Sequence, residues 1–522
     1  MKKVLSILLC IVMVLGIVAC GGGNDNPEQP TTQGNQPTTQ GQAQVPELKG
    51  PGNVTLKRLG YNVAFDPNTD INAGILEEVT GYKVEYSMLP SENADEKLLM
   101  EASSGVYDAI NVSPNQFRTL VDQGACLALD DLLEAYGKDM LAGNKDAIWD
   151  ALRAADGHIY GVPYMYPHSH EIATFMVCRK DLMTAAGITA MPTTVDELYE
   201  DLKTLKAFYG NEYILFSGPF VAASEGSLQW MIPTNIACAF GIYNDWMVDD
   251  QGKVYYITEA PGFQAMIEYF QKLYNEGLID PDWAVNNEST LKEKFSSGKT
   301  IICAANRALP DFCSAALIEN VGIEWDDLDY IGALKGADGT CKYMSTENLN
   351  HVTVIPKTSE NAADVINWLN IRVQNQLYIT IGKEGVHFNY DAKGEIDPIN
   401  PIFAEERGNS YYYMDCTNQE EFEFEWPSRV RKSAGQWHAF SRVTMNADQS
   451  VFVQNDFAFM PAKENYTKYN TALFNDLQDF MLQVMSGTRT IADLPTFQAD
   501  WKNNGGEEVR ADLQTWYDEF YK

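Results

Sequence analysis

Residues 82–112, which read YKVEYSMLPSENADEKLLMEASSGVYDAINV, hold the pattern that decides the fold. The stretch begins with alternating apolar and polar residues over 82–88, which predicts a strand. Residues 94–102 then place their apolar side chains on one helical face, and Gly105 is positioned to end that helix. Residues 109–112, which read AINV, form a short and mostly apolar run, as in a buried strand. A strand, a helix and a strand at this spacing predict a parallel sheet covered by helices.

The same alternation continues on both sides of this stretch. Residues 54–59 alternate and predict a strand that precedes it, and residues 300–304 predict another buried strand. Thr194 and Glu197 match a capping box at the start of an amphipathic helix. The chain has 522 residues, which is too long for one small module and predicts several domains. We therefore predict an α/β protein with two lobes, because a single sheet of this size is improbable on length alone.

The composition excludes several classes of protein. Hydrophobic residues make up 45% and charged residues 21% of the chain, as in an ordinary globular protein and unlike a disordered or fibrous one. There are 38 Lys and Arg against 72 Asp and Glu, which gives a net charge of −34. Such a surface repels phosphate backbones, so nucleic acid is a poor candidate partner.

The N-terminus is typical of an exported and anchored protein. Residues 1–19 carry two lysines, an apolar run and small residues, which predicts a signal peptide. The IVAC sequence over residues 17–20 resembles the bacterial lipobox, which implies cleavage before Cys20 and its lipidation (diacylglycerol and palmitate); an ordinary signal peptide or an uncleaved anchor are the alternatives. Residues 20–45 contain few apolar side chains, which predicts a flexible linker. The chain is therefore expected at the extracellular face of a bacterial cell membrane, held there by lipid.

Seven cysteines follow the anchor, and no CxxC pair is among them. We interpret most of them as small buried apolar groups. Export would permit one or two disulfides, with Cys303 and Cys313 the most plausible pair.

A series of short motifs in a fixed order resembles the bacterial extracellular solute-binding proteins, the receptor components of ABC importers, and in particular the large carbohydrate-binding lipoproteins of that class. Each motif is weak by itself, and the ordered set is specific. They are DDLL and YG at 130–137, DGHIYGVP at 156–163, RKDL at 179–182, MPTTVDEL at 191–198, YNEGLIDP at 274–281, FSSGK at 295–299 and GKEGVHF at 382–388.

The resemblance implies a two-lobed, type II periplasmic-binding-protein-like fold with a hinged cleft between the lobes. By that analogy, one lobe comprises residues 50–166 plus 345–425, and the other residues 167–344 plus 426–522. It also implies a monomer that closes around its ligand and docks on permease subunits.

The chain offers little support for an enzyme or a metal site. It has no GxSxG motif, and paired carboxylates are too frequent to single out a glycosidase. His168 and His170 could hold a metal, but a polar loop with a ligand-facing histidine is the preferred interpretation. Larger relatives often carry a calcium loop, and here residues 208–213 have too few oxygen ligands for one. We therefore expect no metal, no cofactor and no catalytic residues.

Sugars present apolar C–H faces and rings of hydroxyl groups, so a receptor needs aromatic side chains with polar groups at their edges. Open α/β lobes bind ligands at the carboxyl ends of strands and in the crossover loops. We therefore predict a ligand site from residues at such places, although Tyr61, Tyr164, Trp230 and His387 have structural roles as an alternative. The predicted residues are Tyr61, Asn62, Asn115, Tyr164, Tyr166, His168, Trp230, Arg307, Glu347, Asn348, Glu384 and His387.

The sequence thus predicts a lipid-anchored, non-catalytic receptor that captures a carbohydrate, preferably an oligosaccharide, and delivers it to an ABC permease. The alternatives are a binding protein for a peptide or another solute, a surface glycan-degrading enzyme, and a sensor subunit that signals to a kinase.

Overall fold

The structure is a computed structural model, and it describes residues 45–522 apart from short gaps. Residues 45–522 form one compact unit. The gaps are residues 91–92, 155, 166–171, 173, 219–231, 307–313, 346–348, 432, 446, 448–451, 461–462 and 522.

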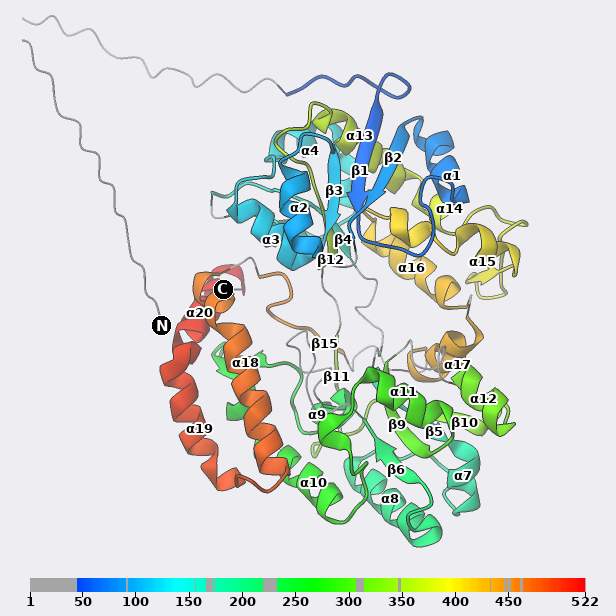
Figure 1. Ribbon diagram of the computed structural model, residues 1–522, viewed down its shortest axis with the longest axis vertical. Coiled ribbons are helices and arrows are strands. Elements are labelled where there is room, and N and C mark those ends of the chain that lie inside the picture. Colours follow the sequence, from blue (N-terminus) through cyan, green and yellow to red (C-terminus); the bar gives the residue numbers. More distant parts are fainter. Residues whose placement is uncertain are drawn as a thin grey trace, which may run out of the picture. The chain divides into compact units, whose positions relative to one another are not determined.

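The first sheet has five strands in the order β2-β1-β3-β12-β4 (Figure 1). Strands β1 (Thr55–Gly60), β2 (Lys83–Met88) and β3 (Ala109–Val112) are parallel to one another. Strand β12 (Leu349–Val354) returns from much later in the sequence and inserts antiparallel between β3 and β4 (Val162–Met165). The parallel β1, β2 and β3 confirm the prediction made from residues 54–112, and β12 is the antiparallel exception to it.

Helices cover this sheet and share one core with it. Leu56, Ile110 and Val352 from the strands pack with Leu120 and Leu369 from two helices. The helices of this part are α1 (Ile71–Thr80), α2 (Ala94–Ala102), α3 (Pro114–Asp122), α4 (Asp130–Tyr136), α5 (Lys138–Ala142), α6 (Asp146–Asp150), α13 (Ala362–Gln374), α14 (Gln376–Thr380), α15 (Ile402–Arg407) and α16 (Gln419–Val430), with the hairpin β13 (Phe388–Tyr390) and β14 (Ile396–Pro398) before α15.

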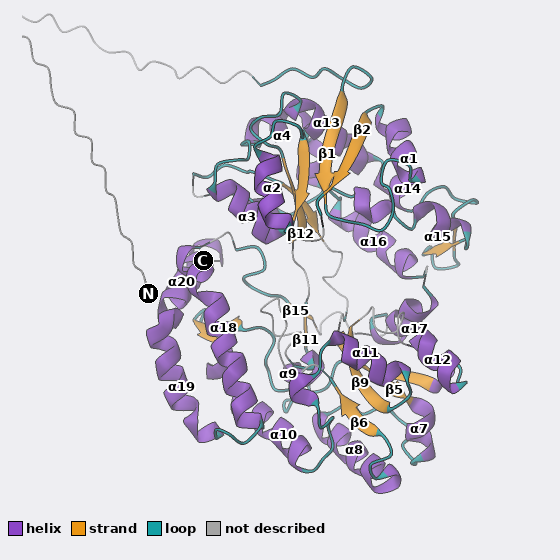
Figure 2. Ribbon diagram, in the orientation of Figure 1, coloured by secondary structure: helices purple, strands orange, loops and turns teal. Residues whose placement is uncertain are grey.

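The second sheet has four strands in the order β10-β5-β9-β6. Strand β5 (Thr174–Arg179) is antiparallel to both β9 (Thr300–Asn306) and β10 (Leu328–Ile331), whereas β6 (Ile214–Ser217) is parallel to β9. The predicted strand at 300–304 is therefore confirmed. Figure 2 shows the orange strands of this sheet with purple helices against them.

The helices of the second part form a larger core. Phe216 and Ile302 from the sheet pack with Leu202, Phe270 and Leu477 from three helices. Its elements are α7 (Lys180–Ala185), α8 (Val195–Tyr209), α9 (Thr234–Ala239), α10 (Phe263–Asn275), α11 (Glu288–Ser296), α12 (Ala315–Val321), α17 (Ala434–Val443), α18 (Glu464–Met485), α19 (Leu494–Trp501) and α20 (Glu507–Tyr521), with the short strands β7 (Trp246–Val248), β8 (Val254–Tyr256), β11 (Tyr343–Met344) and β15 (Phe452–Val453).

The predicted capping box at α8 is only half right. Thr194 Oγ1 accepts the backbone N–H of Glu197 as expected, at 3.1 Å. The Glu197 carboxylate instead accepts from the backbone N–H and the hydroxyl of Thr193. The reciprocal bond therefore reaches one residue further back than the motif implies.

The chain passes between the two sheets three times: after β4, before β12, and between α16 and α17. The predicted boundary at residue 425 falls inside α16, which runs on to Val430. Arg429 near its end donates to the carbonyl oxygen of Thr380 and to Ser410 Oγ, which ties the whole helix to the first part. The other predicted boundaries remain predictions.

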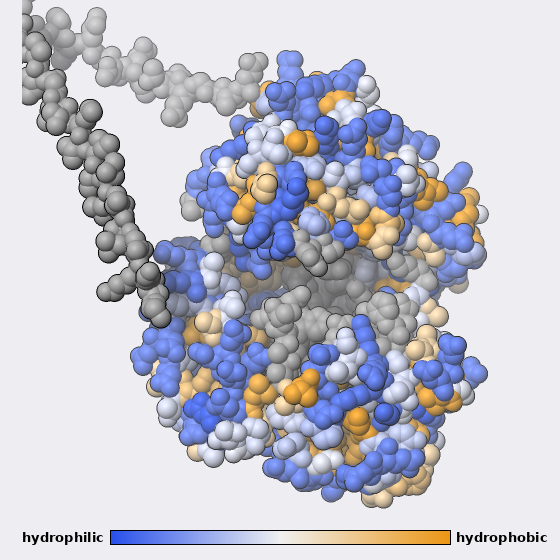
Figure 3. Space-filling model, in the orientation of Figure 1, coloured by the Kyte–Doolittle hydropathy of each residue, from blue (hydrophilic) through white to orange (hydrophobic). Residues whose placement is uncertain are grey.

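The visible surface is mostly polar, as the composition leads one to expect, and most of the described cysteines are buried. Hydrophilic side chains cover most of the visible face in Figure 3, with the hydrophobic ones scattered among them. Cys126, Cys178, Cys238 and Cys416 are buried, as interpreted from the sequence, and burial raises the pKa of Cys126 to about 12. Cys313 lies outside the described residues, so its pairing with Cys303 stays a prediction. None of the described helices is both long and apolar enough to span a membrane.

Candidate functional site

Four strand ends meet at one edge of the first sheet. Strands β1, β3 and β4 finish at this edge, and β12 begins there, because Leu349 pairs with Met165 and Val352 with Val112. Residues that follow β1 and β3, or lie near the end of β4, are therefore brought together. This is the edge at which open α/β sheets bind their ligands.

Aromatic rings from three of these strand ends form a contiguous group. The ring centroids of Tyr61 and His351 are 4.8 Å apart, and those of His351 and Tyr164 are 6.2 Å apart. Tyr164 in turn lies 6.0 Å from Phe422 of α16. The structure thus brings two predicted site residues together, with His351 between them. We call Tyr61, His351 and Tyr164 the aromatic group.

The three members of the aromatic group differ in exposure. Tyr61 and His351 are partly exposed, whereas Tyr164 is only 4% exposed. Side chains of α16 account for this burial, because Tyr164 shares a cluster with Phe422, Trp426 and others. Tyr164 therefore supports the group from within, and the surfaces available to a ligand belong to Tyr61 and His351.

A buried ion network lies next to the aromatic group. Asp415 Oδ1 accepts from Arg58 Nη2 at 2.7 Å and from Asn111 Nδ2 at 3.1 Å, while its Oδ2 accepts from Arg372 Nη1 at 3.1 Å. The Arg58 guanidinium also lies 4.5 Å from the ring centroid of Tyr412, which packs edge-on against Tyr61. The network holds the strand ends in place beneath the group.

Gly60, the last residue of β1, makes this arrangement possible. A Cβ atom at this position would lie 2.2 Å from Arg58 Nη1 and 3.0 Å from the Tyr412 hydroxyl. Any larger residue would therefore displace the guanidinium or the ring.

His351 is kept uncharged by its surroundings. Burial lowers its pKa, repulsion by Arg58 lowers it further, and attraction to Asp415 opposes them, with the result that the pKa is about 4. At neutral pH, one ring nitrogen therefore carries a proton and the other is an acceptor.

The predicted asparagines lie on the rim of this edge. Asn62 is exposed, and its side chain donates to the carbonyl oxygen of Leu89 across 3.4 Å. Asn115 is exposed in the first turn of α3, after β3, where its carbonyl oxygen accepts from the hydroxyl of Thr119. Both side chains are accessible, as a ligand-contacting role requires.

The two predicted residues of the late loop lie in a different setting. His387 is 5% exposed; its Nδ1 accepts the backbone N–H of Lys383, and its Nε2 lies 2.8 Å from Glu406 Oε2. Glu384 is exposed and bridges to Phe388 through the backbone. These contacts support the structural alternative for His387, because they fix the loop that leads into β13.

The remaining predicted ligand residues, Tyr166, His168, Trp230, Arg307, Glu347 and Asn348, lie outside the described residues, as do Cys20 and His170. In the sequence, Trp230 lies after β6, and Arg307 directly follows β9. Their roles stay predictions. Within the described part of the chain, no group of three or more His, Cys, Asp or Glu side chains is arranged to hold a metal ion.

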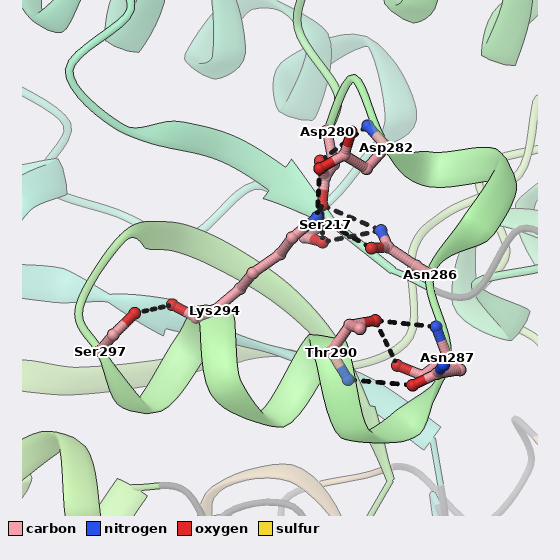
Figure 4. Close-up of polar contacts among 8 residues, drawn as sticks. All are labelled: Ser217, Asp280, Asp282, Asn286, Asn287, Thr290, Lys294 and Ser297. Atoms are coloured by element: carbon pink, nitrogen blue, oxygen red, sulfur yellow. Dashed lines mark hydrogen bonds and ion pairs between the residues drawn. The ribbon is translucent and has the colours of Figure 1, made fainter.

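The second sheet carries a polar network at the corresponding end of β6 (Figure 4). Asp280 is fully buried, and its Oδ2 accepts from Ser217 Oγ at 2.6 Å, Lys294 Nζ at 2.8 Å and Asn286 Nδ2 at 2.9 Å. Lys294 also reaches Asp282 at 3.1 Å. Burial alone would raise the pKa of Asp280, but these hydrogen bonds outweigh it and hold the pKa below its usual value. This network, the Asp280 network, locks the loop between α10 and α11 onto β6.

Two features of the site escaped the analysis of the sequence. His351 was missed because it lies inside β12, and a polar residue in a strand suggests a solvent-facing position. Asp415 was missed because its partners, Arg58 and Arg372, are far away in the sequence. The only available signal was the position of His351 close to the return crossover, three residues after Asn348.

Known proteins resemble this chain over most of its length. A lipoprotein of Bacillus subtilis (strain 168), LipO, is 23% identical over 460 residues, which cover 85% of this chain and 88% of LipO. The polygalacturonan/rhamnogalacturonan-binding protein YtcQ of the same organism is 22% identical over 536 residues, covering 96% of each chain.

The structure of the ABC-transporter substrate-binding protein FusA of Streptococcus pneumoniae with kestose superimposes with a TM-score of 0.60 at 18% identity. The match covers 90% of this chain and 99% of FusA. This likeness and the strand order of the first sheet confirm the predicted type II periplasmic-binding-protein-like fold. The model of the family of bacterial extracellular solute-binding proteins matches residues 68–370, more than half of the sequence, and the chain belongs to that family.

Proposed function

We propose that this protein is a lipid-anchored receptor that captures a carbohydrate outside the cell, preferably an oligosaccharide, and delivers it to the permease of an ABC importer. The observation that carries the proposal is the aromatic group, in which Tyr61 and His351 offer ring faces at the ligand-binding edge of the first sheet. Apolar C–H faces of sugar rings pack on such rings, and the polar residues on the rim can bind hydroxyl groups.

The relatives support this choice of ligand. YtcQ is named for binding polygalacturonan and rhamnogalacturonan, and FusA is named as a fructooligosaccharide ABC transporter substrate-binding protein. Both names describe binding proteins, which favours a receptor over a glycan-degrading enzyme. In this proposal the two sheets belong to two lobes, which close around the sugar through the three connections between them.

The proposed anchor rests on the sequence. A lipobox-like cysteine at position 20 precedes a linker with few apolar residues, and LipO is a lipoprotein by name. Two acyl chains would give stable attachment at the membrane, whereas one chain gives only marginal binding. Cys20→Ala should therefore abolish the incorporation of labelled palmitate into the protein, and incorporation into the variant equal to that of wild type would contradict lipid anchoring at Cys20.

Ligand binding is tested on the full-length protein in detergent, with kestose, trigalacturonate and lacto-N-tetraose as glycans and a set of tripeptides as comparators. We expect at least one glycan to raise the melting temperature and no peptide to do so, because only a ligand of the native state stabilises it. Tyr61→Ala should lower the affinity for that glycan at least tenfold. Tyr390→Ala, which changes an exposed tyrosine of β13, is the matched control.

Two other outcomes would replace the proposal. A thermal shift with peptides and none with glycans would identify a peptide receptor. Products released from labelled glycans, and lost on substitution of a carboxylate at the site, would identify an enzyme.

A further inference from the structure

We propose that His351 determines which sugar the receptor accepts, by forming a hydrogen bond from its Nδ1 atom to a hydroxyl group of a glycan that packs on Tyr61. This inference rests on the proposed function, since it assigns a residue to the site of that receptor. Three observations carry it: the position of the strand that holds His351, an unpartnered atom of its ring, and the charges around it.

The first observation is an irregularity of β12 at His351. Leu349 pairs with Met165 and His351 with Tyr164, so two residues of β12 advance while β4 advances by one. The extra residue makes a β-bulge. Bulges change the direction of the side chains next to them and are frequent beside binding sites. Here the bulge precedes His351 at the strand end where it meets Tyr61.

The second observation is that the Nδ1 atom of His351 is buried and has no hydrogen-bond partner among the residues that the structure describes. A buried polar atom without a partner costs free energy, so such atoms in a native protein call for an explanation. The neighbouring rings of Tyr61 and Tyr164 are within packing distance, at 4.8 and 6.2 Å between centroids. The His351 ring as a whole is partly exposed and lies against Tyr61, so a rotation of the ring would bring Nδ1 to a sugar packed on Tyr61, which would then supply the partner.

The third observation concerns the kind of ligand. Among the described residues, Arg58 and Asp415 are the charged groups that face His351, and the Arg58 charge disfavours a second positive charge beside it. An uncharged imidazole presents either a donor or an acceptor at Nδ1, depending on its tautomer. A hydroxyl group can donate or accept, so it satisfies Nδ1 in both tautomers, whereas a carboxylate can only accept. The site therefore suits a hydroxyl of a sugar better than a carboxylate.

Two substitutions separate the ring from its polar atom. His351→Phe keeps an aromatic ring and removes Nδ1, whereas His351→Asn removes the ring and keeps a polar atom near the position of Nδ1. Of kestose, trigalacturonate and lacto-N-tetraose, the one that gives the largest thermal shift is called the panel glycan. It is titrated into each variant by calorimetry, together with its monodeoxy analogues. Melting temperatures without sugar show whether each variant folds.

We expect His351→Phe to fold with an unchanged or slightly raised melting temperature, because it removes an unpaired buried atom, and to bind the glycan at least tenfold more weakly. His351→Asn should recover part of that loss. The decisive comparison uses the deoxy analogue that lacks the bonded hydroxyl. It should bind wild type at least tenfold more weakly than the parent glycan, and the Phe variant should no longer distinguish the two.

Several outcomes would overturn the inference. If the Phe variant binds the parent glycan as tightly as wild type, or still discriminates among all deoxy analogues as wild type does, His351 does not bind a hydroxyl. Binding by wild type would in that case leave the proposed receptor intact. If wild type binds none of the glycans, the proposed function fails and the role of His351 fails with it.

Discussion

Arg58 and Asp415 are 357 residues apart in the sequence, yet Arg58 Nη2 and Asp415 Oδ1 lie 2.7 Å apart in the interior. Arg372 binds the other carboxylate oxygen, so one acidic side chain joins β1, α13 and the segment before α16. Both side chains of the first pair are 1% exposed or less. The edge of the first sheet that carries the aromatic group thus depends on a contact between distant parts of the chain.

We predict that Asp415→Ala destabilises the protein by about 3–5 kcal/mol, because it leaves two buried guanidinium groups without their carboxylate. Urea unfolding followed by circular dichroism measures the change. Glu101→Ala is the control, since it breaks the partly exposed ion pair with Lys97 and should cost less than about 1 kcal/mol. Equal losses of unfolding free energy in the two variants would show that the buried network contributes no more to stability than the ion pair between Lys97 and Glu101.

The Asp280 network gives a second prediction about stability. Lys294→Met removes the cation that faces Asp280 and Asp282, and keeps a side chain of similar length. A fully buried carboxylate would then lack its charge partner, and we expect a loss of about 3 kcal/mol or more. The double variant with Asp280→Asn should recover part of this loss, since the buried charge is then absent as well. If the loss of unfolding free energy in the double variant equals the sum of the losses in the two single variants, the pair does not interact.

Four strands could be predicted because each has a local pattern, namely β1, β2 and β3 of the first sheet and β9 of the second. Residues 109–112 are fully buried in β3, and a short run that is apolar except for Asn111 favours such a strand. The placement of β12 between β3 and β4 had no such signature, since it depends on pairing with residues far away in the sequence.

The candidate site could be predicted only in part for the same reason. Tyr61 and Tyr164 were found from their positions at strand ends. The burial of Tyr164 was not foreseen, because Phe422 and Trp426, which cover it, come from α16. Tyr412 and Tyr413 pack in the interior and lie in a 3-10 turn at Ser410–Tyr413.

A buried acid on α16 gives a prediction about pH. The carboxyl group of Glu425 is fully buried. The Thr380 hydroxyl lies 2.8 Å from the carbonyl oxygen of Gln376 and 2.7 Å from Glu425 Oε2. Burial raises the pKa of Glu425 to about 8, with Glu421 adding to the rise and Thr380 and Arg429 opposing it.

The folded state therefore holds a proton on Glu425 at pH values at which the unfolded chain, with a pKa of 4.5, has released it. The contribution to stability is fully present below pH 4.5 and is lost as the pH rises towards 8, by at most about 1.4 kcal/mol per pH unit. Glu425→Gln should remove this slope and be more stable than wild type above pH 7, as measured by urea unfolding from pH 5 to 9. Glu420→Gln, at an exposed position of the same helix, should keep the wild-type slope.

The last prediction concerns the pH dependence of ligand binding. An ordinary histidine titrates near pH 6.5, and a charged imidazole at the site would then weaken binding between pH 7.5 and 5.5. In this protein, burial and Arg58, opposed by Asp415, lower the pKa of His351 to about 4. Its protonation state should therefore be constant from pH 8 to 5, and the dissociation constant for the panel glycan should change less than twofold over that range. Calorimetry at half-unit intervals measures it, and nuclear magnetic resonance follows the ring proton of His351, assigned by its absence in His351→Phe.

A resonance that titrates near pH 6.5, or an affinity that falls with a midpoint there, would mean that His351 is solvated and free to ionise. The Arg58 charge would in that case not lower the pKa of the ring, and His351 would be charged in part at the pH of binding. The proposed preference for a hydroxyl over a carboxylate would then fail, because it depends on a neutral imidazole.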